Sequence, residues 1–198
     1  RGETLDQLMK RLTGGLDEEG NPYFDLRQGT KRGAEAIIRT SVQAVANDAR
    51  MRVYRDNADI MEGLQWVSTL DLRTTPGCAA RDGLLWDMEG NPIGHTMYLD
   101  MPPAHWNCRS CLTPVTKSFR EMDIPIDEFP ESTRASMDGQ VPEGKTFEQW
   151  ISEQPEGAAE KVFGKGRAEL WRHGKITVRD MVDQRGRPLT LEELREQG

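Results

Sequence analysis

The sequence has no long apolar run and few of the residues that carry metal or redox chemistry. No stretch approaches the roughly 20 apolar residues that a membrane-spanning helix needs, so we expect no membrane partner. Among 198 residues there are only three cysteines and three histidines. An odd number of cysteines argues against a disulfide scaffold, so these residues need another explanation.

All three cysteines gather around one histidine. The run His105-x2-Cys108-x2-Cys111 supplies three thiol or imidazole groups from one loop, and Cys78 supplies a fourth from an earlier turn. Thiolate and imidazole are ligands that zinc prefers. The pattern therefore predicts a structural Zn²⁺ site. The competing interpretation is that the cysteines are small buried apolar residues and that His105 is a hydrogen-bonded loop residue.

The same region has an enzymatic interpretation. His105 and Asn107 beside a metal resemble the histidine and asparagine of small metal-dependent nucleases, in which the histidine activates water. Further ligands or bases are available nearby at Asp71, Asp82, Asp87, His95 and Asp100. However, four nitrogen and sulfur ligands close the zinc shell and leave no position for water. We therefore expect a structural protein and keep the nuclease as the alternative.

Charge is unevenly distributed along the chain. The net charge is -7, which argues against a protein that coats itself with nucleic acid. The segment from Lys161 to Arg187 is the exception, with eight Lys or Arg against three Asp or Glu. This segment is either a solvated helical face, which is the commoner meaning of such a run, or a surface that contacts phosphates.

Hydrophobic periodicity predicts an α+β fold. A helix is expected from about Thr30 to Asn57, with an apolar stripe facing the core formed by Ile38, Val42, Val45, Ala49 and Val53. Strands are expected over 63–70 and 111–116, with a hairpin or loop pair over 84–93. Together these form a small, mostly antiparallel sheet packed on the long helix, with the cysteine and histidine loops at one end.

Four segments follow from these patterns. Residues 1–28 hold a short amphipathic helix with Leu5, Leu8, Met9 and Leu12, and a linker. Residues 29–117 form the core domain. Residues 118–145 are an extended connection that is acidic and rich in proline. Residues 146–198 form a tail of short helices, because capping-box patterns begin at Thr146, Thr177 and Thr190.

Two loop motifs resemble a known family. They are Asp71-x-Arg-Thr-Thr-Pro-x-Cys78-x3-Asp-Gly83 and Pro102-Pro-x-His-x-Asn-Cys-Arg-Ser110, the second followed by Leu-x-Pro-Val at 112–115. The segments 38–40 and 174–180 also fit. In these motifs the chain is similar to the phage Mu F-like head morphogenesis family, whose members are minor capsid proteins of tailed phages and prophages.

This resemblance implies a structural role in the virion. Such proteins are made in the host cytoplasm with the head, and they sit inside it in few copies near the portal. The implied partners are portal or capsid proteins, and the implied role is in head assembly or in DNA packaging or delivery. With this role, the basic segment from Lys161 to Arg187 becomes a candidate for contact with packaged double-stranded DNA. In related proteins similar modules are fused to toxin domains, so a toxin-like effector that uses the His105 and Cys108 region belongs to the same alternative as the nuclease.

Overall fold

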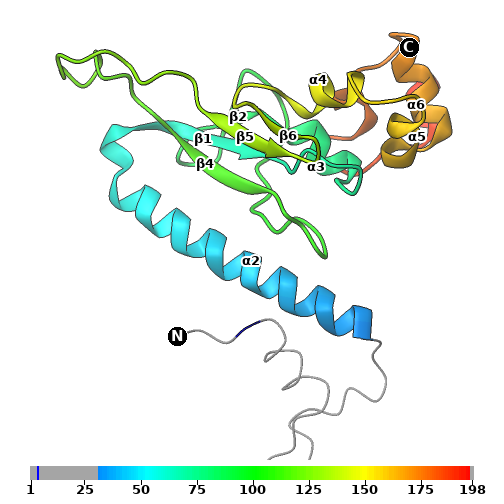
Figure 1. Ribbon diagram of the computed structural model, residues 1–198, viewed down its shortest axis with the longest axis horizontal. Coiled ribbons are helices and arrows are strands. Elements are labelled where there is room, and N and C mark those ends of the chain that lie inside the picture. The colour runs from blue at the N-terminus through cyan, green and yellow to red at the C-terminus, as the bar shows by residue number, and fades with distance from the viewer. Residues whose placement is uncertain (1–3, 5–30, 197–198) are drawn as a thin grey trace, which may run out of the picture.

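The computed structural model describes Thr4 and residues 31–196 and has the expected mixed α+β architecture. The predicted amphipathic helix at Leu5 to Leu12 lies outside the described residues. The long helix α2 (Lys31–Asp56) has nearly the predicted bounds. Figure 1 shows α2 running along one side of the sheet, with the short C-terminal helices gathered at the far end of the molecule. In the described part of the chain, none of the helices combines the length and the apolar character needed to span a bilayer.

A four-stranded sheet forms the centre of the fold. Its strands are β1 (Met61–Val67), β2 (Leu85–Trp86), β3 (Pro92–Ile93) and β4 (Cys111–Thr116), in the order β3-β2-β1-β4. The three pairings between neighbouring strands are antiparallel, and Trp66 of β1 lies opposite Leu112 of β4. Strand β4, which contains Pro114, is at an edge of the sheet, where a residue without a backbone N–H is tolerated.

The core lies on the Trp66 face of the sheet. Trp66 and Trp86 are fully buried with their ring centroids 6.5 Å apart. Phe147 and Trp150 from the tail join the same core cluster. Because side chains of both the core domain and the tail are buried together, the hydrophobic effect holds the two segments against each other.

One prediction about α2 is wrong. Of the five residues expected to face the core, only Ile38 is buried; Ala49 is exposed, and the exposed fractions of Val42, Val45 and Val53 are 55%, 71% and 57%. The other buried side chains of the helix are those of Ala34, Met51 and the polar Asn47, which donates a hydrogen bond to the Pro102 carbonyl at 3.1 Å. The helix turns a partly polar face to the body because loop carbonyls there need donors.

The connection after β4 is more structured than expected. It contains a hairpin of β5 (Thr133–Ser136) and β6 (Gly139–Pro142), which the sequence analysis did not identify. Arg134 of this hairpin reaches into the body and forms an ion pair with the buried Asp82 at 2.9 Å. The hairpin is thus fixed to the core by a buried charge rather than by an apolar stripe, which explains why periodicity did not reveal it.

The tail has the predicted short helices. They are α4 (Phe147–Ser152), α5 (Ala158–Phe163), α6 (Lys165–Arg172) and α7 (Leu191–Glu196), with a 3-10 turn at Arg179–Met181. Thr146 forms the expected capping box with Gln149. Thr177 with Asp180, and Thr190 with Glu193, make the same reciprocal hydrogen bonds.

Candidate metal centre

Cys78 is positioned by a short helix rather than by the turn that the sequence analysis expected. Helix α3 (Pro76–Arg81) begins after Thr75, whose hydroxyl accepts a hydrogen bond from the Cys78 N–H, and Pro76 occupies the first turn. Both features favour helix initiation. Ser68, which follows β1, donates its hydroxyl hydrogen to the Cys78 carbonyl at 2.7 Å. The helix therefore holds the Cys78 sulfur at a fixed place beside the sheet.

His105 and Cys108 lie in a tight turn that precedes β4. The Cys108 N–H donates to the His105 carbonyl at 3.1 Å. Asn107 has a positive φ of 59°, and its N–H donates to the Thr40 hydroxyl of α2 at 2.9 Å. The positive φ is uncommon for a residue other than glycine but is tolerated by asparagine. The turn is thereby attached to α2, and its side chains face α3.

Three of the four predicted ligands come together. The ligand atoms of Cys78, His105 and Cys108 all lie within 4.8 Å of one another. The Cys78 and Cys108 sulfurs are 3.9 Å apart, and the Cys78 sulfur is 3.2 Å from His105 Nε2. In a tetrahedral zinc site, bonds of about 2.3 Å to sulfur and about 2.0 Å to nitrogen place sulfurs about 3.8 Å apart and sulfur and nitrogen about 3.5 Å apart. The three groups thus fit a zinc ion in chemistry and in spacing.

Cys111 is not part of this group. It is the first residue of β4 and pairs with Val67. Successive side chains of a strand point to opposite faces, so Cys111 lies on the face opposite Leu112, which is buried in the same core cluster as Cys78 and Cys108. The cysteine spacing in the sequence did not contain this information, because it does not show where the strand begins.

The second nitrogen of His105 fixes the orientation of the ring. Nδ1 lies 2.9 Å from the Trp106 carbonyl oxygen, so Nδ1 carries the hydrogen when Nε2 is a ligand. The hydrogen bonds from Cys78 and His105 lower the pKa of Cys108, whereas the hydrogen bond with Cys108 and burial raise the pKa of Cys78. The hydrogen bond with Cys108 also raises the pKa of His105. The surroundings thus favour the thiolate at Cys108, and a bound metal ion would favour it at Cys78 as well.

The other residues considered as ligands or bases have different partners. Asp71 accepts hydrogen bonds from Arg109, and Asp82 from Arg134. Asp87 caps its own turn through Asn91, and Asp100 lies 3.7 Å from Arg81. His95 contacts the Leu85 carbonyl and accepts from the Met97 N–H.

Asp71 and Arg109 form a bidentate ion pair beside the three ligands. The Arg109 side chain donates to both carboxylate oxygens, and the Arg73 N–H donates to Oδ1 at 2.9 Å. Burial alone would raise the pKa of Asp71, but the hydrogen bonds from Arg109 and from the Arg73 backbone outweigh it and lower the pKa to about 2. This pair ties the loop after β1 to the turn that carries Cys108.

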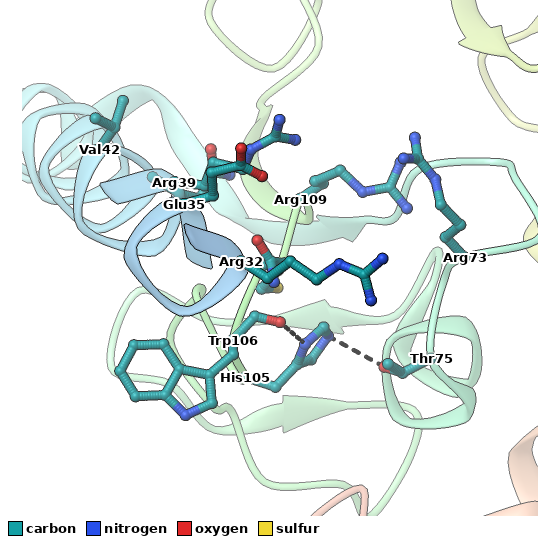
Figure 2. A pocket seen from close by; sticks show the side chains of 12 residues that line it. Arg32, Glu35, Arg39, Val42, Arg73, Thr75, His105, Trp106 and Arg109 are labelled. Carbon is teal, nitrogen blue, oxygen red and sulfur yellow. Dashed lines mark hydrogen bonds between the residues drawn. The ribbon is translucent and has the colours of Figure 1, made fainter. Parts of the chain in front are cut away.

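A groove of about 1150 Å³ opens between α2 and the His105 turn. Four arginines line it together with Thr75, His105, Trp106 and Asn107; they are Arg32, Arg39, Arg73 and Arg109. Figure 2 shows Arg32 extending from α2 across the groove toward Arg73, with His105 beneath it. The sequence analysis did not identify this groove, because its arginines come from three separate segments.

The comparison with protein families decides the relationship. The family described as Phage Mu protein F like protein matches residues 1–113 of the 198. The chain belongs to this family. No curated protein and no solved structure gives a significant match.

The Mu F-like match covers the whole candidate centre. Residues 1–113 include Asp71, Cys78, His105, Cys108 and Arg109, and the match ends inside β4. The hairpin and the short helices follow it. The part of the chain that resembles the family is therefore the part that builds the three-ligand group and the groove.

The basic segment of the tail is partly neutralised by its own fold. Arg172 pairs with Glu160 at 2.9 Å, and Arg187 pairs with Asp183 and Glu193. Arg167 donates to the Leu189 and Phe163 carbonyls. Three of the eight basic side chains between Lys161 and Arg187 thus have internal partners, which leaves fewer of them for contact with DNA.

Proposed function

We propose that this chain is a structural minor head protein of a tailed phage or prophage. It acts in head assembly, and in packaging or delivery of DNA, from inside the head near the portal. The observation that carries the proposal is the family match over residues 1–113, which contains the two loop motifs. In this proposal, portal and capsid proteins are its partners.

The group of Cys78, His105 and Cys108 brings together two parts of the chain that are far apart in sequence. We propose that it holds one Zn²⁺. Cys78 and Cys108 are 30 residues apart in sequence, so the ion would join α3 to the turn before β4. Such a cross-link restricts the unfolded chain and fixes both loops relative to the sheet. The loops would then present a constant surface to neighbouring head subunits.

Complementation of a deletion tests this function. In the phage or prophage that encodes the chain, loss of the gene should reduce the yield of infectious particles, and the wild-type chain should restore it. Cys108→Ser should fail to restore the yield, whereas Cys111→Ser, which removes the cysteine outside the three-ligand group, should restore it. Two results together would contradict the proposal: a full yield of infectious particles from the deletion strain, and no detection of the chain by mass spectrometry in heads purified from the wild type.

One observation favours the alternative, a metal-dependent nuclease or effector. Three protein ligands instead of four leave a zinc position for water, and the groove with its arginines lies beside that position. The test is cleavage of plasmid DNA with Mg²⁺, Mn²⁺ or Zn²⁺ by the wild-type chain and by His105→Ala. We expect no cleavage by either. Cleavage by the wild-type chain that His105→Ala abolishes would establish the enzyme and contradict a purely structural role.

A further inference from the structure

The groove beside the three-ligand group gathers positive charge from parts of the chain that are far apart in sequence. Arg32 and Arg39 come from α2, Arg73 follows β1, and Arg109 precedes β4. Arg32 and Arg39 are seven residues apart, which places them two turns apart along the helix axis, about 10 Å. Like charges that share a concave surface repel each other, so this arrangement is favourable only when an anion neutralises it.

Carboxylates within the groove neutralise the arginines only in part. Asp71 engages Arg109 and Arg73, and the side chain of Arg73 remains 77% exposed. Glu35 is the one acidic residue that lines the groove. Within the part of the chain that the structure describes, Arg32 and Arg39 form no ion pair. The groove therefore keeps a positive charge although the chain as a whole carries -7.

The turn that bears Trp106 fixes one wall of the groove. The Asn107 N–H donates to Thr40, and the His105 ring lies against the Trp106 carbonyl. Trp106 itself is 67% exposed. Its neighbours His105 and Cys108 belong to the three-ligand group, so a bound metal ion would hold this wall in place and preserve the spacing of the guanidinium groups.

The chemistry of the lining favours a phosphate backbone. Guanidinium groups match phosphate oxygens in a bidentate geometry. Sites for single strands also present several aromatic rings, on which successive bases stack. This groove has four arginines and one exposed aromatic side chain, Trp106, and therefore fits a backbone whose bases are already paired.

We propose that the groove between α2 and the His105 turn binds the phosphate backbone of double-stranded DNA through Arg32, Arg39, Arg73 and Arg109. This proposal replaces the tail segment from Lys161 to Arg187 as the main DNA contact. The choice of duplex DNA rests in part on the proposed function, which places the chain in a head that holds such DNA. Contacts of this kind do not depend on base sequence and weaken as salt rises.

Fluorescence anisotropy with a labelled 20-base-pair duplex tests the proposal. The variant Arg32→Gln/Arg39→Gln should weaken binding on the order of a hundredfold at roughly 50 mM salt and should lower the slope of log K against log salt by about 2. The matched control Arg52→Gln/Arg55→Gln removes the same charge from the other end of α2. It should change the affinity by less than about twofold, because Arg52 lies 13 residues, roughly 20 Å, along α2 from Arg39, which exceeds the Debye length.

The outcomes separate the possible ligands. Equal binding by the two double variants, or no binding by the wild-type chain, would overturn the proposal. It would also fall if oligo(dT) bound in the groove while the duplex did not, or if a poly-glutamate peptide alone showed the dependence on Arg32 and Arg39. Circular dichroism checks that both variants fold. The two proposals can fail separately. If the wild-type chain does not bind DNA but the Arg32→Gln/Arg39→Gln chain still enters heads, the DNA inference fails and the proposed head function stands.

Discussion

The buried carboxylate of Asp82 provides the most demanding test of how the fold is held together. Its side chain is fully buried and accepts hydrogen bonds from the Ser68 and Phe147 N–H groups, each at 2.7 Å, and from Arg134. These bonds join the end of β1, the hairpin and α4 at the C-terminus of α3, the helix that carries Cys78. Replacing Asp82 with asparagine leaves the buried Arg134 guanidinium without a counter-charge.

The expected loss is large. Removing one partner of a buried ion pair typically costs about 3–5 kcal/mol. With a urea m-value of about 2 kcal/mol per molar, the unfolding midpoint of Asp82→Asn should fall by about 2 M. The matched control is Asp48→Asn, whose pair with Arg52 is exposed on both sides and is worth less than about 0.5 kcal/mol.

A second variant protects the test against a simple failure to fold. Arg134→Met removes the charge on the other side, so Asp82→Asn/Arg134→Met should lose less stability than the sum of the two single variants. Urea unfolding followed by tryptophan fluorescence measures the stability of the wild type and of the four variants, Asp48→Asn included. A loss below about 1 kcal/mol for Asp82→Asn, or full additivity in the double variant, would refute the role given to this ion pair.

The remaining predictions concern the metal, pH and packing. Removing zinc with a chelator should cost about 3–4 kcal/mol of stability, the value for a cross-link that closes a loop of about 30 residues, and should lower the Tm by about 10 °C. Cys111→Ser should respond as the wild type does. A Tm that does not change with the chelator would count against the structural zinc site. Because the pKa of Asp71 is lowered to about 2, its contribution to stability is present above about pH 4. That contribution is lost as the pH falls toward 2. In this window the free energy of urea unfolding should therefore depend less on pH for Asp71→Asn than for the wild type, and an equal dependence would contradict the stabilising role of the Asp71 carboxylate. A Cβ on Gly63 would lie 2.4 Å from the Trp86 carbonyl oxygen, so Gly63→Ala should cost about 1–3 kcal/mol in thermal unfolding; a neutral effect would show that the two strands move apart easily.

Much of the fold follows from local sequence patterns. The bounds of α2, the strands β1 and β4, and the capped helices of the tail agree with periodicity and capping signals. These signals act within a few residues, so they are visible without tertiary information. Helix α3 also carries a local signal, Thr75 followed by Pro76, which marks a helix start that the sequence analysis read as a turn.

The face of α2 was wrongly predicted for a physical reason. Apolar periodicity assigns Val45 to the core and Asn47 to solvent, but the buried face of α2 combines the apolar Ile38 and Met51 with Asn47, which meets a loop carbonyl. Gln43 and Asn47 supply the donors that those carbonyls need. Whether a helix packs on apolar side chains or on backbone carbonyls depends on the tertiary arrangement, which a single sequence does not reveal.

The site was predictable to the extent that its ligand chemistry is rare. With three cysteines and three histidines in the chain, their clustering indicated the region, and Cys78, His105 and Cys108 do come together. Side chains alternate between the two faces of β4, so Cys111 lies on the face away from the core cluster that holds Cys78 and Cys108 and does not join the three-ligand group. The arginine groove was not predictable, since arginines are common and only the fold brings Arg32 beside Arg73 and Arg109.

Elemental analysis of the natively purified, unchelated protein tests the structural metal centre most directly. One zinc ion per chain is expected for the wild type and for Cys111→Ser, and about none for Cys78→Ser or Cys108→Ser. A wild-type protein that is folded and free of metal would contradict the proposed role of Cys78, His105 and Cys108.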